Sequence, residues 1–426
     1  MLQLNNIRQN IALVKQKLTK KNFAALHLID NVVAKDDQRK ALILQSDELK
    51  NNINLASKQI GQLMAAKQHA QAEILKANVA NWKTEMQPLD TQLIAVEKEI
   101  ETILYQIPNT PADIVPHGKT PNDNLTIKQG GTIPTLMQGA LPHWDILASY
   151  NLINFELGNK ITGAGFPVYI GKGAKLQRAL IQYFLAYNTA AGYIEHQVPL
   201  MVNEASAYGT GNLPDKEGQM YHATVDNFYL IPTSEIPLTN IYRGDLLKAT
   251  ELPKKLTGYT PCFRREAGSY GSDVRGLNRL HQFDKVEIVQ ITTANNSHQT
   301  LDAMVSHVEI LLQNLELPYR ILRLCGGDMS FASAITYDFE VYSAAQEKWL
   351  EVSSVTNFET YQSNRLKLRY KNETGKTELC HTLNGSSLAL PRIMAALIEN
   401  NQTANGITLP KVLHSYFNDC IITPQN

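Results

Sequence analysis

Residues 36–105 show an almost uninterrupted helical pattern, with Gly61 as the only glycine and Pro88 as the only proline. Within and just beyond this stretch, two sets of apolar residues recur at alternating steps of three and four. That spacing places side chains along one narrow seam of a helix. The sets are Leu49, Ile53, Ala56, Ile60 and Leu63, and Trp82, Met86, Leu89, Leu93, Val96, Ile100, Ile103 and Ile107. The helical phase breaks between them, at residues 66–72.

Two helices with one apolar seam each bury those seams best against each other. The pattern therefore predicts an antiparallel two-helix coiled-coil arm, with about thirty residues per helix and a length of roughly 45 Å. Because an interior proline loses a backbone hydrogen bond and costs about 3 kcal/mol, we expect a kink at Pro88.

The segment 107–124 contains four prolines and ends the helical pattern. It is the expected boundary between a helical domain of residues 1–108 and a second domain of residues 109–426. Beyond it, a helical stretch at 174–191 is accompanied by β-rich runs. These runs lie at residues 227–232, 259–266, 281–291, 319–324, 338–342 and 349–354. Because the strands are grouped and not regularly interleaved with helices, the expected fold class is α+β with an antiparallel sheet.

Forty basic and forty acidic residues give a net charge of zero, so any nucleic-acid site must be a local feature. The arm has such a local imbalance. Residues 50–83 contain one acid, Glu73, and five lysines, namely Lys50, Lys58, Lys67, Lys76 and Lys83. Residues 85–101, nearer the root of the arm, contain five acids and one base. A solvated coiled-coil surface and a phosphate-binding tip both explain this distribution.

Several classes of protein are disfavoured by what the sequence lacks. The first residues show no basic segment followed by an apolar one, and no run approaches ~20 apolar residues, so a cytoplasmic location is expected. Cys262, Cys325, Cys380 and Cys420 have no C-x-x-C spacing, which argues against a disulfide framework or a zinc ribbon. Neither a G-x-G-x-x-G motif after a strand nor a G-x-x-x-x-G-K-[ST] motif occurs, which disfavours Rossmann and P-loop nucleotide binding.

Residues 259–290 combine two expected strands with a loop rich in glycine and arginine. The two-residue period of a strand places Cys262, Arg264 and Glu266 on one face of the first strand, and Phe283, Lys285 and Glu287 on one face of the second. Such a face suits a nucleotide, with Arg264 on a phosphate, Phe283 beneath a base and Glu266 accepting from an exocyclic amine. A charged cross-strand ladder without any ligand explains the same residues.

Five segments, taken in order, resemble the class II aminoacyl-tRNA synthetases in their seryl form. GYIEHQVP at 192–199 resembles motif 1, FRRE at 263–266 with HQFDKVE at 281–287 resembles motif 2, and LNGSSLALPRIMAALIENNQ at 383–402 resembles motif 3. IPTSEIPLTN at 231–240 resembles the Thr-x-Glu loop, and EVSSVTNF at 351–358 resembles the metal and ATP strand. The helical arm resembles the tRNA-binding domain of the same family, so the resemblance covers nearly the whole chain.

The resemblance implies an ATP-dependent serine–tRNA ligase. Such an enzyme makes seryl-adenylate and transfers the seryl group to the 3′-terminal adenosine of tRNA(Ser), with tRNA(Sec) as a further candidate. It also implies Mg²⁺ and a homodimer in which Pro199 ends a strand at the interface. The implied domains are the arm, binding tRNA through the five lysines, and a class II catalytic domain with an antiparallel sheet.

The resemblance also assigns residues to roles. The catalytic residues would be Arg264, Glu287 and Arg392. The ATP site would contain Arg264, Arg265, Glu266, Arg275, Phe283, Glu351, Val352, Ser353, Ser354 and Arg392, with Glu351 and Ser354 as Mg²⁺ ligands. The serine site would contain Thr233, Ser234, Glu235, Glu287, Asn384 and Ser386. Plainer interpretations are a Glu287 paired with Lys285 or Arg279, a helix cap at Asn384, and ordinary strand serines at 353 and 354.

The chain departs from the family pattern at Ser387 and Pro391 in motif 3, and at Val355 in the metal strand. Pro391 suits the first turn of a helix, where its missing N–H costs nothing.

Other class II enzymes, of the threonyl, prolyl or histidyl type, would add a C-terminal anticodon-binding domain, whereas this sequence ends soon after motif 3. A ligase for carrier proteins would lack the long arm and use a cysteine at its metal. An RNA-binding scaffold without activity would be expected to have lost Arg264, Glu287 or Arg392.

Overall fold

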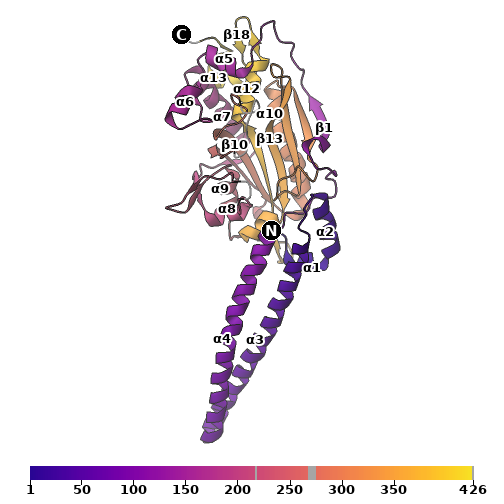
Figure 1. The fold of residues 1–426 in the computed structure, drawn as a ribbon, viewed down its shortest axis with the longest axis vertical. Coiled ribbons are helices and arrows are strands. Elements are labelled where there is room, and N and C mark those ends of the chain that lie inside the picture. Colours follow the sequence, from indigo (N-terminus) through magenta and orange to yellow (C-terminus); the bar gives the residue numbers. More distant parts are fainter. Residues whose placement is uncertain (216–217, 267–274, 425–426) are drawn as a thin grey trace. The chain divides into compact units, whose positions relative to one another are not determined.

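The computed structural model describes residues 1–215, 218–266 and 275–424 (Figure 1). The chain forms two compact units, one of residues 2–19 and 23–108, the other of residues 1, 20–22 and 109–426. Within the described ranges, no helix is both long enough and apolar enough to span a lipid bilayer.

The first unit is built from helices α1 (Leu4–Gln9), α2 (Ile11–Lys20), α3 (His27–Ala65) and α4 (His69–Gln106). The two long helices pack against each other as a hairpin, so the predicted coiled-coil arm is confirmed. They contain 39 and 38 residues, more than the thirty expected. Helix α3 is longer because it begins at His27, nine residues before the predicted start, and its first part packs against α1, where Arg8 pairs with Asp36 and Asp37 at 3.1 and 2.7 Å.

The apolar seam of this hairpin follows the sequence pattern. Ala56, Val96 and Ile100 are buried, and the other seam positions between residues 49 and 103 are partly buried. The turn at residues 66–68 places Lys67 in the left-handed region, with φ 58°. Helix α4 continues through Pro88 without interruption. The expected bend at this proline stays a prediction.

The second unit is organised around an eight-stranded sheet with the order β1-β11-β12-β13-β16-β10-β9-β4. The strands are β1 (Leu125–Gly130), β4 (Ile194–Glu195), β9 (Lys254–Phe263), β10 (Gln282–Thr292), β11 (Tyr319–Arg323), β12 (Ile335–Ser343), β13 (Lys348–Glu359) and β16 (His381–Ala389). In the described part of the sheet, neighbours are antiparallel except β4 and β9. The predicted α+β class with an antiparallel sheet is confirmed.

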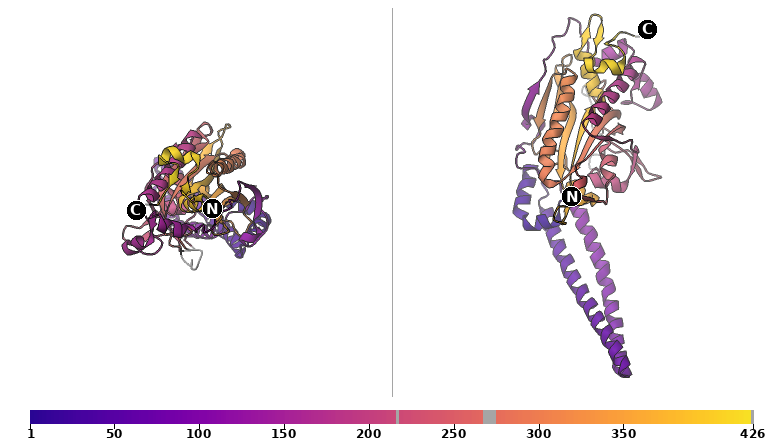
Figure 2. Two further views of the ribbon diagram at one scale, coloured as in Figure 1. Left: turned by 90° about the horizontal axis from the view of Figure 1, so that it is seen from above. Right: turned by 180° about the vertical axis from the view of Figure 1, so that it is seen from behind.

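Helices α7 (Lys172–Ala190), α10 (Ser297–Asn314) and α12 (Leu390–Asn400) pack against this sheet (Figures 1 and 2). Their apolar side chains and alternate residues of the strands, such as Val286 and Ile288 of β10, form the main core. The intervening residues Lys285 and Glu287 line a cavity instead. The predicted alternation along this strand is therefore confirmed, and Lys285 and Glu287 lie on the face opposite the main core.

Shorter elements frame the sheet. The helices are α5 (His143–Ser149), α6 (Phe155–Ile161), α8 (Glu204–Thr210), α9 (Glu235–Asn240), α11 (Tyr361–Leu366) and α13 (His414–Phe417). Small sheets are formed by β2 (Ile153–Asn154) with β3 (Val168–Tyr169), by β5 (Met201–Asn203), β7 (Phe228–Leu230) and β6 (His222–Ala223), by β15 (Thr377–Leu379), β14 (Arg369–Lys371) and β8 (Leu246–Lys248), and by β17 (Gln402–Thr403), β18 (Gly406–Thr408) and β19 (Ile421–Ile422).

Candidate active site

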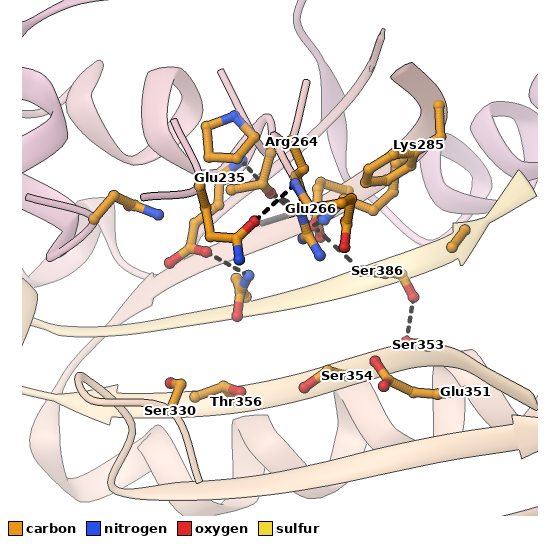
Figure 3. A pocket seen from close by; sticks show the side chains of 18 of the residues that line it. Glu235, Arg264, Glu266, Lys285, Ser330, Glu351, Ser353, Ser354, Thr356 and Ser386 are labelled. Carbon is orange, nitrogen blue, oxygen red and sulfur yellow. Dashed lines mark hydrogen bonds and ion pairs between the residues drawn. The ribbon is translucent and has the colours of Figure 1, made fainter. Parts of the chain in front are cut away.

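The polar face of the central sheet opens into a cavity of about 600 Å³ (Figure 3). Side chains from β10, β13, β16, α9 and the start of α12 converge on it. Most of the residues singled out in the sequence line it, namely Thr233, Glu235, Arg264, Glu266, Phe283, Glu287, Glu351, Val352, Ser353, Ser354, Asn384, Ser386 and Arg392. Antiparallel register brings distant segments together here, since Glu287 lies opposite Ser386 and Val355 lies opposite Gly385.

Three of the residues singled out do not line the cavity. The Ser234 hydroxyl is buried without a hydrogen-bond partner in the described chain, and the Arg265 backbone N–H donates to the Gln219 carbonyl at 2.9 Å. The Arg275 guanidinium lies 4.7 Å from the Trp144 ring centroid and 3.7 Å from an Asp145 oxygen. Roles for these three residues stay predictions. Residues 267–274, which belong to the loop rich in glycine and arginine, lie outside the described residues.

Glu287 is a fully buried carboxylate that already has a cation beside it. The Lys285 ammonium lies 2.5 Å from Glu287 Oε1, and the Thr233 and Ser386 hydroxyls donate to the same oxygen at 3.0 and 3.3 Å. Glu287 Oε2 is buried and has no hydrogen-bond partner in the described chain. The plainer interpretation of Glu287, as an ion-pair partner of Lys285, is therefore confirmed. This ion pair lines the cavity.

Glu235 is the second buried carboxylate of the cavity, and it has a different environment. Asn384 Nδ2 donates to Glu235 Oε2 at 2.9 Å, so Asn384 acts on this carboxylate from strand β16 and is not a helix cap. Burial, and to a smaller extent the Glu287 charge, raise the pKa of Glu235 to about 7, against the opposing effects of the Gln362 hydrogen bond and of the Lys285 and Arg264 charges.

Arg264 and Glu266 reach the cavity from a loop and not from a strand. Strand β9 ends at Phe263, and Glu266 has a φ of 48° in the left-handed region, so the expected strand over 259–266 is wrong at its end. The turn still directs both side chains into the cavity. The Arg264 guanidinium lies 5.2 Å from the Phe283 ring centroid, and the Glu266 carboxylate pairs with Arg279. A cation, an aromatic face and a carboxylate therefore lie together, as a nucleotide site needs.

Arg392 lies in the first turn of α12, directly after Pro391, which occupies the start of that helix as its sequence position suggested. Its Nη1 donates to the Glu351 carbonyl at 2.7 Å, and its Nε donates to the Asn278 carbonyl at 3.1 Å. Backbone acceptors thus orient the guanidinium. The Glu351 carboxylate lies farther away, at 3.8 Å, which leaves it available for another cation.

The residues near Glu351 suit Mg²⁺. Asp338 lies opposite Ser354 in the β12–β13 ladder, and Asp338 Oδ1 is buried without a hydrogen-bond partner in the described chain. Burial and then the charge of Glu351 raise the pKa of Asp338 well above its ordinary value. Two carboxylates and the Ser354 hydroxyl supply hard oxygen atoms, and Mg²⁺ commonly takes one or two carboxylates together with substrate phosphates. Within the described chain, no group of three His, Cys, Asp or Glu residues is placed so that it could hold a metal ion by itself.

Several cavity residues were missed by the sequence analysis. The segments 210–215 and 330–332 form parts of its wall, and Asp338 lies near the Glu351 carboxylate. Lys285 was placed on the face of Glu287 by the alternation along the strand, but it was not assigned to the site. The wall segments belong to turns whose only sequence signal is ordinary turn composition, so pattern reasoning had no means of assigning them to the site.

The five lysines near the tip of the hairpin are all exposed. Lys50 lies 3.8 Å from Asp47 and Lys76 lies 2.7 Å from Glu73. Lys58, Lys67 and Lys83 form no ion pair with other described residues. These side chains are free to meet an anionic partner, and tRNA binding by them stays a prediction.

Comparisons with known proteins agree with this geometry. Residues 1–111 match the Seryl-tRNA synthetase N-terminal domain, and residues 220–401 match the tRNA synthetase class II core domain (G, H, P, S and T). A serine–tRNA ligase of Salinibacter ruber is 46% identical over 418 residues, covering 98% of each chain. One from Mesoplasma florum is 42% identical over 419 residues, covering 98% of this chain and 99% of its own.

Agreement in fold can be judged from a seryl-tRNA synthetase of Pyrococcus horikoshii, whose crystal structure was determined as a complex with ATP. It superposes with a TM-score of 0.93 at 29% identity, and all of both chains is covered. The match of residues 1–111 to a seryl-specific domain decides against the threonyl, prolyl and histidyl enzymes and against a carrier-protein ligase. Because both domain families and relatives of nearly full length agree, this chain belongs to the seryl-tRNA synthetase family of ATP-dependent class II ligases.

Proposed function

We propose that this protein joins L-serine to ATP as seryl-adenylate and then transfers the seryl group to the 3′-terminal adenosine of tRNA(Ser). In the first step a serine carboxylate oxygen attacks the α-phosphorus and pyrophosphate leaves. In the second step a ribose hydroxyl of the terminal adenosine attacks the seryl carbonyl carbon and AMP leaves. The observation that carries this proposal is one cavity with two arginines for phosphates and two buried carboxylates for an ammonium group.

Positioning and charge neutralisation account for most of the catalysis in such displacements. Arg264 would hold the α-phosphate and the serine carboxylate together, beside Phe283, on which adenine would stack. Arg392 would meet the other face of the base and the γ-phosphate, and Glu266 would accept from the adenine amino group. Mg²⁺ held by Glu351 and Ser354 would neutralise phosphate oxygens when bound.

Serine would be recognised by the opposite part of the cavity. Thr233 and Glu235 would meet its ammonium group, Glu287 its ammonium and hydroxyl groups, and Asn384 and Ser386 would form the floor. A site built to hydrogen-bond a hydroxyl group rejects analogues without one by up to about 10⁴ to 10⁵, because its own polar groups would be left unpaired. Alanine and glycine would be excluded in this way.

The two units would divide the work. Residues 1–108 would bind tRNA through the exposed tip lysines, and residues 109–426 would carry out the chemistry. Phosphate contacts supply much of the affinity for nucleic acid, so unpaired exposed lysines are suited to this role. Charging of tRNA(Sec) as a second substrate and a cytoplasmic location belong to the same proposal.

A two-fold dimer is also part of the proposal. Around the edge strand β4 and the following motif 1 residues, large apolar side chains are exposed: Ile194 is 66%, Leu200 is 37% and Met201 is 49% exposed. An open strand edge with apolar neighbours is suited to pairing with a second copy. Light scattering on the purified protein tests it, and a monomer at micromolar concentration contradicts it.

The test of the catalytic proposal is ATP–pyrophosphate exchange measured with each of the twenty amino acids. Serine should stimulate exchange far above the other nineteen, and tRNA(Ser) should then accept labelled serine. Exchange driven mainly by another amino acid contradicts the serine assignment. A complete lack of exchange, with tRNA still bound, supports an RNA-binding scaffold instead.

A further inference from the structure

We infer that Gln362 is a positioning residue of the amino-acid site, which holds the Glu235 carboxylate in place and leaves its charge free for the ammonium group of the substrate. This inference rests on the proposed function and extends it to a residue that the sequence analysis did not single out. Gln362 lies on α11 and does not line the cavity, so it acts through Glu235 and not by touching a ligand.

The hydrogen bonds of Gln362 fix the orientation of its amide. Its Nε2 donates to Glu235 Oε1 at 2.6 Å and to the Thr210 carbonyl at 3.1 Å, and its Oε1 accepts from the Thr382 hydroxyl at 2.7 Å. A flipped amide would place its oxygen against the Thr210 carbonyl oxygen, which carries no hydrogen at any pH. With 1% of its surface exposed, Gln362 has no water available to replace these partners. The side chain is therefore a rigid donor aimed at Glu235.

The two carboxylates of the cavity differ in what holds them. Glu287 has the Lys285 ammonium at 2.5 Å, whereas Glu235 is held by the uncharged amides of Gln362 and Asn384. No lysine, arginine or histidine of the described chain forms an ion pair with Glu235. A buried carboxylate without a counter-charge is unfavourable, and a bound cation relieves this. Glu235 is thus the carboxylate whose charge a substrate ammonium group can neutralise.

The amides of Gln362 and Asn384 both hold Glu235, but only Asn384 lines the cavity. Asn384 lines the cavity and stands among the residues that would touch serine, so changing it would alter direct contacts as well. Gln362 does not line the cavity, and it contacts two residues that do, Glu235 and Thr210. Replacing Gln362 therefore isolates the effect of holding the carboxylate from any contact with the substrate.

Titration supplies a readout that a purely structural role would not affect. Glu235 has a pKa raised to about 7 by burial, with Glu287, Lys285 and Arg264 as the charged groups that face it. A carboxyl with a raised pKa is neutral below that value and negative above it, so ammonium binding strengthens as the pH rises through about 7. The Gln362 hydrogen bond lowers this pKa, and its removal should move the rise to higher pH.

The experiment is serine-dependent ATP–pyrophosphate exchange across neutral pH for the unaltered protein and the variants Gln362→Met and Thr382→Val. Gln362→Met keeps the length of the side chain and removes the donor. It should raise the KM for serine about 10- to 100-fold at pH 7, leave the KM for ATP nearly unchanged, and shift the pH dependence upward. Thr382→Val removes only the bond that orients the amide, so a smaller increase of about 3- to 10-fold is expected.

Asn364→Ala is the matched control, because it lies on the same short helix, where its Nδ2 donates to the Met1 carbonyl at 2.9 Å, away from Glu235. It should leave both KM values and the pH profile unchanged. An equal fall in kcat for all three variants, with unchanged KM for serine and unchanged pH profile, would show that α11 is only structural and overturn the inference. If Gln362→Met does not fold, Thr382→Val decides alone. A lack of serine-dependent exchange in the unaltered protein overturns the proposed function and this inference together, whereas normal exchange with unaffected variants overturns the inference only.

Discussion

The long hairpin and the central cavity use charged residues in opposite ways. The lysines near the hairpin tip are exposed and either unpaired or paired along one helix, as Lys76 is with Glu73 at 2.7 Å. In the cavity, Lys285 and Glu287 are 7% and 0% exposed and pair at 2.5 Å. Exposed pairs contribute about 0–1 kcal/mol, whereas removing one partner of a buried pair costs about 3–5 kcal/mol. Charges on the hairpin should therefore act additively and respond to salt, and charges in the cavity should depend on one another.

Whether the two units have separate activities can be tested by deleting residues 44–104 and joining the ends with a short flexible linker. Serine activation should stay within about twofold, because no cavity residue lies in the deleted segment. Charging of tRNA at physiological salt should fall by about 10³ or more, since most phosphate contacts would be lost. Exchange and charging assays on the same preparation measure both. Equal loss of the two activities contradicts the division of labour.

Within the cavity, Arg264→Ala should lower kcat/KM for exchange about 10³-fold, because a cation that neutralises a transferring phosphate supplies about 10³ to 10⁵ of the rate. Arg264→Lys is the matched control. It keeps the charge but loses the planar fork and the stacking on Phe283, and it should recover only part of the rate. Full activity of Arg264→Ala would contradict the assignment of this arginine to the phosphate.

The contrast between buried and exposed ion pairs can be tested by replacing one lysine of the cavity and one lysine of the hairpin by methionine. Lys285→Met leaves the Glu287 carboxylate buried and unpaired, and should reduce the free energy of unfolding by about 3–5 kcal/mol. Lys76→Met removes an exposed partner of Glu73 and should change it by less than about 1 kcal/mol. Denaturant unfolding of both variants measures the difference. The double variant Lys285→Met/Glu287→Gln should recover part of the loss, and equal effects of the two single variants would contradict the contrast.

The smallest effect is expected from the hairpin lysines taken together. Replacing Lys50, Lys58, Lys67, Lys76 and Lys83 by glutamine should weaken tRNA binding about tenfold at physiological salt and flatten its salt dependence, because each lost phosphate contact reduces the slope by about 0.7–0.9. Serine activation should not change. Binding isotherms at several salt concentrations give the slope. An unchanged slope would place the tRNA contact on other residues.

The elements that the sequence predicted are those maintained by neighbours along the chain. The seams of α3 and α4 follow a three- and four-residue spacing, and the alternation along β10 separates Val286 and Ile288 from Lys285 and Glu287. The strand pattern gave a wrong prediction where a residue from another segment pairs with the end of the strand. The period of β9 was carried through to Glu266, which instead turns into the left-handed region and pairs with Arg279.

Local pattern and motif order were enough to predict the hairpin, the antiparallel α+β class and thirteen of the residues that line the cavity. Tertiary structure alone decided how those residues are paired. Gln362 meets Glu235 across 127 positions of sequence, and Asn384 meets it across 149. A periodic pattern records which face of an element is buried, because apolar side chains recur on that face at the period of the helix or strand. It cannot record which distant donor reaches a buried carboxylate, because that depends on the register between strands and on where a turn directs a side chain.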